Sequence, residues 1–395
     1  MDKKRIQAAV GVAPADGLIS PAYVVAQPFP GTVPGYFAYL YRTAAYMGEV
    51  NNYSRGIVAD RNRLYWDEFK QIPTPYPPPP EQVAIVRFLD QAERRIRRYI
   101  RAKRKLIGLL NEMKQGIIHR TVTRGLDPNV RLKPSGVEWL GDVPEHWRST
   151  RLKHLATIQT GITLGSLGKN YGSEVLVERP YLRVANVQTG RLDLSQVKTL
   201  RMPPTEAESA LLREGDVLMT EGGDIDKLGR GCIWTGEIPG CLHQNHIFAV
   251  RPRRHWLLPE FLVGLMGSLY GRGYFEITAK KTTNLASTNA TTIGSLPLWL
   301  PEIEEQRRIL AWVAEKTSAL DVMRVKVERE IDLIHEFRTR LISDLVTGKV
   351  DVREAAAKLP EEPDESETYD KAQAQDESKG ESVEELEVTP KEAEV

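Results

Sequence analysis

A long internal repeat constrains the fold of this chain more than any other feature. Segments near the start of the sequence match segments further along at a constant offset of 224 in the numbering. The matched pairs are Ala22–Pro28 with His246–Pro252, Ile72–Gln82 with Leu296–Gln306, and Met113–Thr123 with Phe337–Thr347. Each copy has the same order: a strand ending in proline, an amphipathic helix, a strand with prolines at its end, and Glu-Gln at the start of a long helix. The repeat therefore predicts two similar units in one chain.

The long helix of each copy carries apolar residues that step by four and three positions alternately, which is a heptad pattern. The first series is Ile85, Leu89, Ala92, Ile96, Tyr99, Leu106, Leu110, Met113 and Ile117, with Lys103 as its break. The second is Ile309, Val313, Leu320, Met323, Val327, Ile334, Phe337 and Leu341, with breaks at Lys316 and Glu330. A helix of about 35 residues is about 50 Å long and needs a partner for such a stripe. The simplest partner is the other copy, although one buried helix could show the same spacing. The long tether between the helices leaves both parallel and antiparallel packing open.

Turn-forming residues after Thr123 indicate a linker, and a second globular domain should open near Trp147. We expect its strands at 181–187, 216–220, 231–235 and 246–250, and a helix at 259–275. The predicted divisions are 1–80 for part of a first globular domain, 81–122 for the first long helix, 123–146 for the linker, 147–303 for the second domain, 304–350 for the second long helix and 351–395 for a tail.

The net charge of +1 averages two regions of opposite sign. Residues 361–395 hold 14 acidic residues against three lysines, a net charge of −11, so residues 1–360 carry +12. A body this basic suits a polyanionic partner. The acidic run has too few apolar residues to bury a core, which predicts a disordered tail.

Several classes of protein are not supported by the sequence. No segment approaches a membrane span or a secretory signal, and two cysteines are too few for a disulfide framework, so we expect a cytoplasmic protein with reduced thiols. There is no Walker A loop, no G-x-G-x-x-G and no Asn-Pro-Pro-aromatic motif of amino-methyltransferases. Cys241, His243 and His246 lack a fourth ligand at metal-site spacing. We therefore expect no catalysis, no metal and no cofactor.

Several stretches resemble the specificity subunit of type I restriction-modification systems. They are Gly17–Tyr23, Tyr53–Gly56, Tyr65–Trp66, Val143–Trp147, Arg151–Leu155, Gly215–Asp224 and Leu296–Gln306. The resemblance covers about residues 17–350. It implies an α+β fold in which two globular target-recognition domains, each reading half of a split DNA site, are joined by two long antiparallel helices forming a coiled coil. It also implies methyltransferase subunits bound to the helices and motor-nuclease (restriction) subunits in the assembly, with the methyltransferases placed over an adenine in each half-site.

The front of the sequence departs from this family pattern. At the repeat offset, the counterpart of Trp147 would carry the number −77, ahead of Met1. The first recognition domain is then expected to be a C-terminal remnant. A misassigned start codon, a gene fragment and a reduced subunit that works as a dimer are three explanations.

Candidate DNA-binding residues are cations that could meet phosphates and amides that could read base edges. In the second domain they are Lys169, Asn170, Tyr171, Arg183, Asn186, Gly222, Gly223, Asp224, Lys227, Arg230, Gln244, Asn245, Lys280, Lys281, Thr282, Thr283 and Asn284. In the remnant they are Arg55, Arg61 and Arg63, beside the aromatic pair Tyr65–Trp66. For each of them a solvated surface residue is the alternative, and for the Gln244–His246 segment a further alternative is that its side chains satisfy backbone groups.

The predicted subunit interface consists of the apolar positions of the two heptad series. These are Ile85, Leu89, Ile96, Leu106, Leu110, Met113, Ile309, Val313, Leu320, Val327, Ile334, Phe337 and Leu341. Arg94, Arg95, Arg97, Arg98, Arg101, Lys103, Arg104 and Lys105 form a cationic run on the first helix, suited to DNA phosphates, to an acidic partner surface or simply to solvent. We expect a non-catalytic DNA-specificity subunit. The alternatives are a scaffold that holds methyltransferase subunits while recognising DNA weakly or through one domain, and an enzyme that binds S-adenosylmethionine. The target sequence and the oligomeric state do not follow from the sequence.

Overall fold

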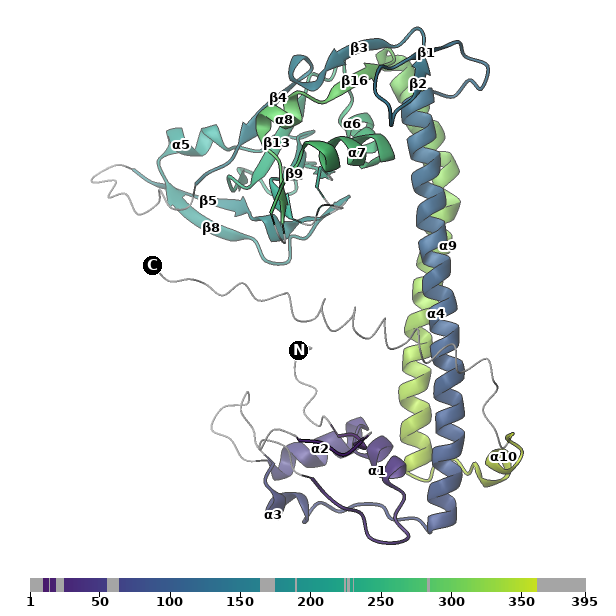
Figure 1. The fold of residues 1–395 in the computed structure, drawn as a ribbon. Coiled ribbons are helices and arrows are strands. Elements are labelled where there is room, and N and C mark those ends of the chain that lie inside the picture. The colour runs from purple at the N-terminus through teal and green to yellow at the C-terminus, as the bar shows by residue number, and fades with distance from the viewer. Residues whose placement is uncertain are drawn as a thin grey trace. The chain divides into compact units, whose positions relative to one another are not determined.

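The computed structural model describes residues 10–13, 15–18, 25–54, 64–163, 175–188, 190–223, 225, 228–229, 231–282 and 285–360 (Figure 1). The chain divides into two compact units. The first comprises Met1–Ala102 and Glu330–Val395, and the second comprises Lys103–Arg329. Helices and strands are mixed, which confirms the predicted α+β class.

Two long helices, α4 (Pro79–Arg124) and α9 (Ile303–Val346), run through both units. In the first unit, Nε of Arg338 on α9 donates to the Glu93 carboxylate on α4 at 2.5 Å. In the second, Nζ of Lys114 on α4 donates to the Asp321 carboxylate on α9 at 2.7 Å. The N-terminal half of each helix thus pairs with the C-terminal half of the other, which confirms the antiparallel arrangement.

Residues close in sequence account for where the long helices begin and end. Prolines at the start of α4 fit the first helical turn, where the backbone N–H has no helical partner. At the other ends, Gly125 and Gly348 adopt φ values of 74° and 73°. This left-handed conformation is costly for residues with a Cβ and terminates helices.

The seam between the helices only partly follows the predicted heptad positions. Ile85, Leu89, Leu110, Ile309 and Val327 are buried. Ile96, Leu106, Val313, Leu320, Ile334 and Leu341 are half-buried. Met113 and Phe337 are each 57% exposed, contrary to expectation. The helical repeat of 3.6 residues drifts against a 3.5-residue pattern, so other positions enter the seam. Ile100 is buried, and so are the polar residues Glu93 and Thr317.

The first unit is helical in its described part. It contains α1 (Pro34–Leu40), α2 (Ala44–Tyr53), α3 (Trp66–Phe69) and α10 (Arg353–Ala357). Its core joins Tyr36, Leu40 and Tyr46 to residues of both long helices. Val352 and Ala356 are also buried, so residues 351–360 are packed structure, whereas the predicted tail began at 351.

The strands predicted for the first copy do not form among its described residues. Residues 25–28 and 72–78 have no strand pairing, although Ile72 itself is buried. In the second copy, the matching strand β16 (Pro297–Leu300) pairs with β3 (Arg148–Arg151). Among the described residues of the first copy, 72–78 have no such strand partner.

The second unit is built on an antiparallel four-stranded sheet of order β11-β9-β13-β4. Its strands are β4 (Ala156–Thr160), β9 (Val217–Thr220), β11 (Gly231–Ile233) and β13 (Ile247–Pro252). A three-stranded sheet joins β12 (Leu242–His243), β5 (Val177–Leu182) and β8 (Lys198–Met202), and another joins β10 (Gly222–Gly223), β15 (Ala286–Ser287) and β14 (Lys280–Lys281). Two hairpins are β1 (Leu132–Pro134) with β2 (Asp142–Pro144), and β6 (Val187–Gln188) with β7 (Arg191–Leu192). The helices are α5 (Pro204–Ser209), α6 (Pro259–Gly267), α7 (Leu269–Thr278) and α8 (Ala290–Gly294).

The strands β9, β11 and β13 lie within two residues of the predicted bounds, and the other two predicted elements differ more. The strand expected at 181–187 ends at Leu182, because a 3-10 turn follows at Val184–Asn186. The helix expected at 259–275 is two helices separated at Ser268, whose ψ of 168° is extended.

The two units use the long helices in equivalent ways. Val122, near the end of α4, is buried in the core of the second unit, where Ile309 near the start of α9 also lies. Val346 is the repeat counterpart of Val122, and it is buried in the core of the first unit beside Ile85 near the start of α4. Each unit therefore packs on the beginning of one long helix and on the end of the other, as a repeat with antiparallel helices requires.

Both cysteines are free and buried in the second unit. Burial raises the pKa of the Cys232 and Cys241 thiols to about 12, with a smaller contribution from Glu237. We expect neither thiol to react with a disulfide reagent at pH 8 while the protein is folded, because the thiolate is the reactive form. Both should react in 6 M guanidinium chloride, and rapid labelling of the folded protein would contradict the expectation.

Candidate nucleic-acid interface

Four predicted DNA-binding segments of the second unit converge at one end of its main sheet, where β9 ends and β13 begins. The backbone N–H of Glu221 donates to the His246 carbonyl at 2.8 Å, and that of Thr288 donates to the Glu221 carbonyl at 2.8 Å. On the other side, the Gln244 N–H donates to the Leu182 carbonyl at 3.0 Å. The described residues of the segments 182–183, 221–223, 244–246, 280–282 and 285–288, far apart in sequence, are thus brought together.

The small sheet β10-β15-β14 joins the glycine segment to the lysine segment. Gly222 pairs with Ser287, and Ser287 pairs in turn with Lys280. Lys280 and Lys281 are exposed, and Thr282 is exposed at the end of the same strand. The structure therefore places two exposed lysines in the same small sheet as Gly222 and Gly223, one strand beyond their direct partner β15.

The local backbone structure favours glycine at positions 222 and 223. A Cβ on Gly222 would lie 3.3 Å from the Ala286 carbonyl oxygen, which is tighter than ordinary contact. Gly223 has a φ of 150°, which side chains disfavour. The absence of side chains leaves the backbone here accessible to a close neighbour such as a phosphate.

Gln244 and Asn245 are half-buried, and His246 is exposed. Their backbone groups are used in the fold, since the Asn245 N–H donates to the Ile162 carbonyl at 2.8 Å. Amide side chains at such a position are suited to adenine edges in the major groove. Nδ1 of His246 lies 2.6 Å from the Glu221 carboxylate, an exposed contact. Glu221 is not among the residues predicted from the sequence, although it lies directly before the two glycines.

Asn186 and Arg183 have mainly structural contacts. Asn186 is buried, and its amide donates to the carbonyls of Asp193 and Gln196 at 2.8 and 3.1 Å. Its Oδ1 accepts from the Arg183 N–H at 2.8 Å. An amide bonded in this way has no free edge for a base, so Asn186 supports the loop and is a poor candidate for DNA reading.

His243 is a structural residue of the second unit. Its ring is fully buried, Nδ1 lies 2.8 Å from the Ile247 carbonyl, and burial lowers its pKa. Within the described residues no group of three or more His, Cys, Asp or Glu side chains could hold a metal ion. Across the same residues, no helix combines the length and the apolar character that crossing a bilayer requires.

The remaining candidates lie outside the described residues. They are Arg55, Arg61, Arg63, Lys169, Asn170, Tyr171, Asp224, Lys227, Arg230, Thr283 and Asn284. Lys169–Tyr171 follow Ile162 and Thr163 in sequence, and Ile162 bridges to Gln244.

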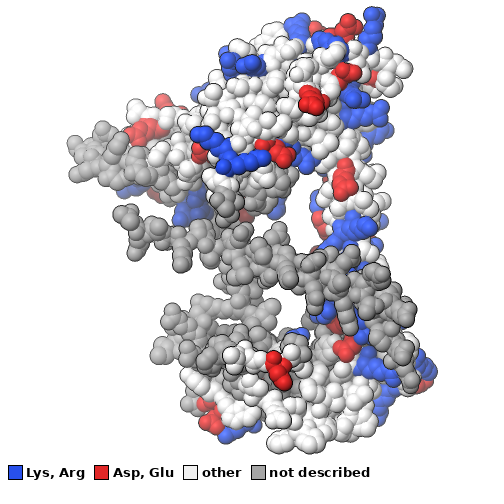
Figure 2. Space-filling view, in the orientation of Figure 1, with Lys and Arg blue, Asp and Glu red and all other residues white. Residues whose placement is uncertain are grey.

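The cationic run on α4 has more partners than its sequence suggests. Arg97 lies 3.6 Å from the Glu93 carboxylate one turn away, and Glu93 also accepts from Arg338 of α9. Arg94, Arg98 and Arg101 also interact with other groups. On the face drawn in Figure 2, lysine and arginine side chains are visible along the long helices, with acidic side chains among them.

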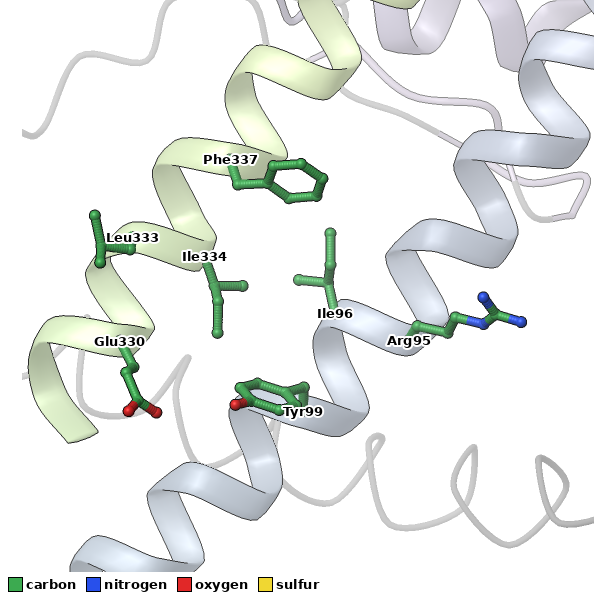
Figure 3. Close-up of a pocket in the computed structure, with 7 residues that line it drawn as sticks. All are labelled: Arg95, Ile96, Tyr99, Glu330, Leu333, Ile334 and Phe337. Carbon is green, nitrogen blue, oxygen red and sulfur yellow. The ribbon is translucent and has the colours of Figure 1, made fainter. Parts of the chain in front are cut away.

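An apolar groove of about 460 Å³ lies between α4 and α9 in the first unit (Figure 3). Its walls are Ile96 and Tyr99 on α4, and Leu333, Ile334 and Phe337 on α9, with Arg95 and Glu330 at the margin. Tyr99, Leu333 and Phe337 are 49%, 47% and 57% exposed. An open apolar surface of this kind on paired helices is typical of a protein-binding site.

Known proteins with sequences similar to this chain include specificity subunits of type I restriction enzymes. The chain is 23% identical over 213 residues to a putative type I restriction enzyme MjaX specificity subunit of Methanocaldococcus jannaschii, covering 53% of this chain and 48% of that protein. It is 22% identical over 321 residues to the type I restriction enzyme EcoKI specificity subunit of Escherichia coli, covering 80% and 65%. No family model matches the sequence. The chain thus spans about half to two thirds of the length of these relatives.

The fold also has a solved counterpart. A chain from a study of complex assembly and conformational transition in a type I restriction-modification system aligns with a TM-score of 0.57 at 17% identity, covering 80% of this chain and 72% of the other. At this identity the match concerns the fold alone. The sequence relatives identify the chain as a homologue of type I restriction enzyme specificity subunits.

Proposed function

We propose that this chain is a DNA sequence-specificity subunit of a type I restriction-modification assembly and that its second unit reads one half of a bipartite DNA site. The observation that carries the proposal is the convergence of Lys280 and Lys281, the Gly222–Gly223 backbone and the Gln244–Asn245 amides on one surface. Cations, open backbone and amides are the three elements that a DNA reader combines.

The proposed mechanism is geometric. Lys280 and Lys281 hold phosphates and set the register of the duplex, while Gln244 and Asn245 contact base edges. Arg55, Arg61 and Arg63 serve the other half-site in the first unit. The antiparallel helix pair determines the spacing at which half-sites are bound, and base pairs between them remain unread. The chain itself carries out no chemistry, and methyltransferase and nuclease subunits act on the bound DNA.

A selection from random duplexes tests this proposal directly. Binding at low salt should enrich one sequence, and its affinity should fall steeply with salt, by a slope of about 0.9 in log K per phosphate contacted. Equal binding of all sequences would favour a scaffold that holds partner subunits. Binding of S-adenosylmethionine by the isolated chain would favour an enzyme.

The groove of Figure 3 is the proposed docking site for a methyltransferase subunit. Replacing the exposed aromatic ring of Phe337 by serine should lower the affinity for that subunit at least about tenfold, since exposed aromatics dominate such interfaces. Co-purification and titration calorimetry would measure this. Val322 on α9 is 64% exposed outside the groove, so Val322→Ser serves as control. Equal effects of the two substitutions would contradict the assignment.

A further inference from the structure

Two buried glutamines occupy equivalent positions in the two copies of the repeat. Gln82 lies in the first turn of α4 and Gln306 in the first turn of α9, and both are fully buried. Their numbers differ by the repeat offset of 224. Neither takes part in the proposed DNA surface. A buried amide must find partners for its oxygen and its NH₂ group, so its contacts identify what it holds together.

In the second unit, Gln306 makes three hydrogen bonds to two separate backbone segments. Its Oε1 accepts from the Leu258 N–H at 3.0 Å. Its Nε2 donates to the Trp256 carbonyl at 2.9 Å and to the Pro301 carbonyl at 3.1 Å. One side chain on α9 thus binds the loop that enters α6 and also the loop that enters α9.

In the first unit, Gln82 makes the corresponding contacts. Its Oε1 accepts from the Val33 N–H at 3.0 Å, and its Nε2 donates to the Pro77 carbonyl at 2.8 Å. Pro77 and Pro301 are separated by the repeat offset, whereas Val33 and Leu258 are separated by one position more. The first copy therefore has one more residue than the second between the capped N–H and the glutamine, and the hydrogen bond from that N–H to the glutamine Oε1 is present in both copies.

The two N–H groups have the same structural role. Val33 and Leu258 are the N-cap residues of α1 and α6, and each precedes a proline. Neither helix start has a hydrogen bond from its own capping side chain. The glutamine of the long helix therefore supplies the partner for the N-cap N–H. A hydrogen bond is directional, unlike apolar packing, so this contact limits rotation of α1 or α6 about the long helix.

We infer that Gln82 and Gln306 are positioning residues that fix the direction in which each recognition domain projects from its long helix. The importance of this role for DNA binding rests on the proposed function, because the direction of a recognition domain would set the orientation of the DNA half-site that it binds. The contacts themselves are independent of DNA. The glutamine makes the same two kinds of contact in both units, although the spacing to the capped helix differs by one residue. This recurrence distinguishes a positioning role from incidental burial.

The test is a distance measurement within the second unit of the full-length chain. Spin labels at Arg191→Cys on β7 and Val325→Cys on α9 report the angle between domain and helix by double electron–electron resonance. Both sites are exposed, and the native thiols are buried, so labelling is selective. We expect one narrow distance distribution in this background. Gln306→Met keeps the length of the side chain but removes its hydrogen bonds. This substitution should widen the distance distribution about twofold or more.

A conservative variant separates positioning from stability. A protonated carboxyl offers an acceptor and one O–H donor, so it can keep the bond from the Leu258 N–H and one of the two bonds to carbonyl groups, whereas a carboxylate only accepts. Burial raises a carboxyl pKa, so Gln306→Glu should give a narrow distribution at pH 5 and a broad one at pH 8. Ile293→Val removes a methylene from the same buried core and should leave the width unchanged.

Unchanged width in Gln306→Met would overturn the inference. If that variant does not fold, the pH series of Gln306→Glu decides, and equal widths at both pH values would overturn it. These readouts need no DNA. Failure of the wild-type chain to select a duplex sequence would reject the proposed function separately.

Discussion

Replacing Arg251 by leucine is expected to lower the free energy of unfolding of the second unit by about 3 kcal/mol, since removing one partner of a buried ion pair leaves an uncompensated charge. The Asp216 carboxylate is fully buried. It accepts from Nε and from an Nη of Arg251, each at 2.7 Å, and from the Arg213 N–H at 2.8 Å. Urea unfolding followed by tryptophan fluorescence would measure the loss.

The double variant Asp216→Asn/Arg251→Leu provides the control. Removing the carboxylate charge as well should recover more than half of the lost stability, because the main cost is the unpaired charge. A loss below about 1 kcal/mol in Arg251→Leu would show that solvent screens the pair. The pair joins β13 to the start of β9, the two strands that deliver the proposed DNA surface. Its removal should therefore also weaken duplex binding.

Reversing two charges on the proposed surface is expected to have the largest effect on function. Lys280→Glu with Lys281→Glu should reduce duplex affinity about 100-fold at about 50 mM salt, because two attractions to phosphate become repulsions. Lys280→Ala with Lys281→Ala should lower the salt slope by about 1.8, or about 0.9 for each lysine removed. Fluorescence anisotropy with a labelled duplex would measure both.

A matched charge reversal lies at the opposite end of the same sheet. Arg253 and Arg254 are exposed and directly follow β13, whereas Gln244–His246 directly precede it. Arg253→Glu with Arg254→Glu changes the net charge equally and should alter affinity less than about threefold. A similar loss in both double variants would mean that binding depends on overall charge, and the surface assignment would fail.

The internal repeat and the heptad spacing were sufficient to predict the large features of the fold. They predicted two long helices and their mutual pairing, because apolar periodicity reports directly which face of a helix is buried. They did not predict which positions fill the seam. Met113 and Phe337 fit the heptad but are exposed, while Glu93 does not fit it and is buried against Arg338. The positions that fill the seam depend on the drift of the helical repeat and on a polar pair between the two helices. Neither can be predicted from the sequence of one helix alone.

For the candidate site, residue types predicted which side chains could bind DNA, but not where those side chains lie relative to one another. Asn186 and Arg183 looked like base readers, yet Asn186 bonds to backbone carbonyls of its own loop. Gln82 and Gln306 looked like markers of a helix start, yet their hydrogen bonds reach the cap of another helix. Side-chain chemistry shows what a residue can bind, but its partners depend on chain segments that are distant in sequence.

The sequence by itself determined the repeat, the helical periodicity and the charge separation between the basic body and the acidic end, because each depends only on the order of residues. The tertiary structure alone decided the antiparallel direction of the helices, and which distant segments meet at the ends of β9 and β13. Strand pairing and helix packing join residues that lie far apart along the chain, and local propensity carries no information about such partners.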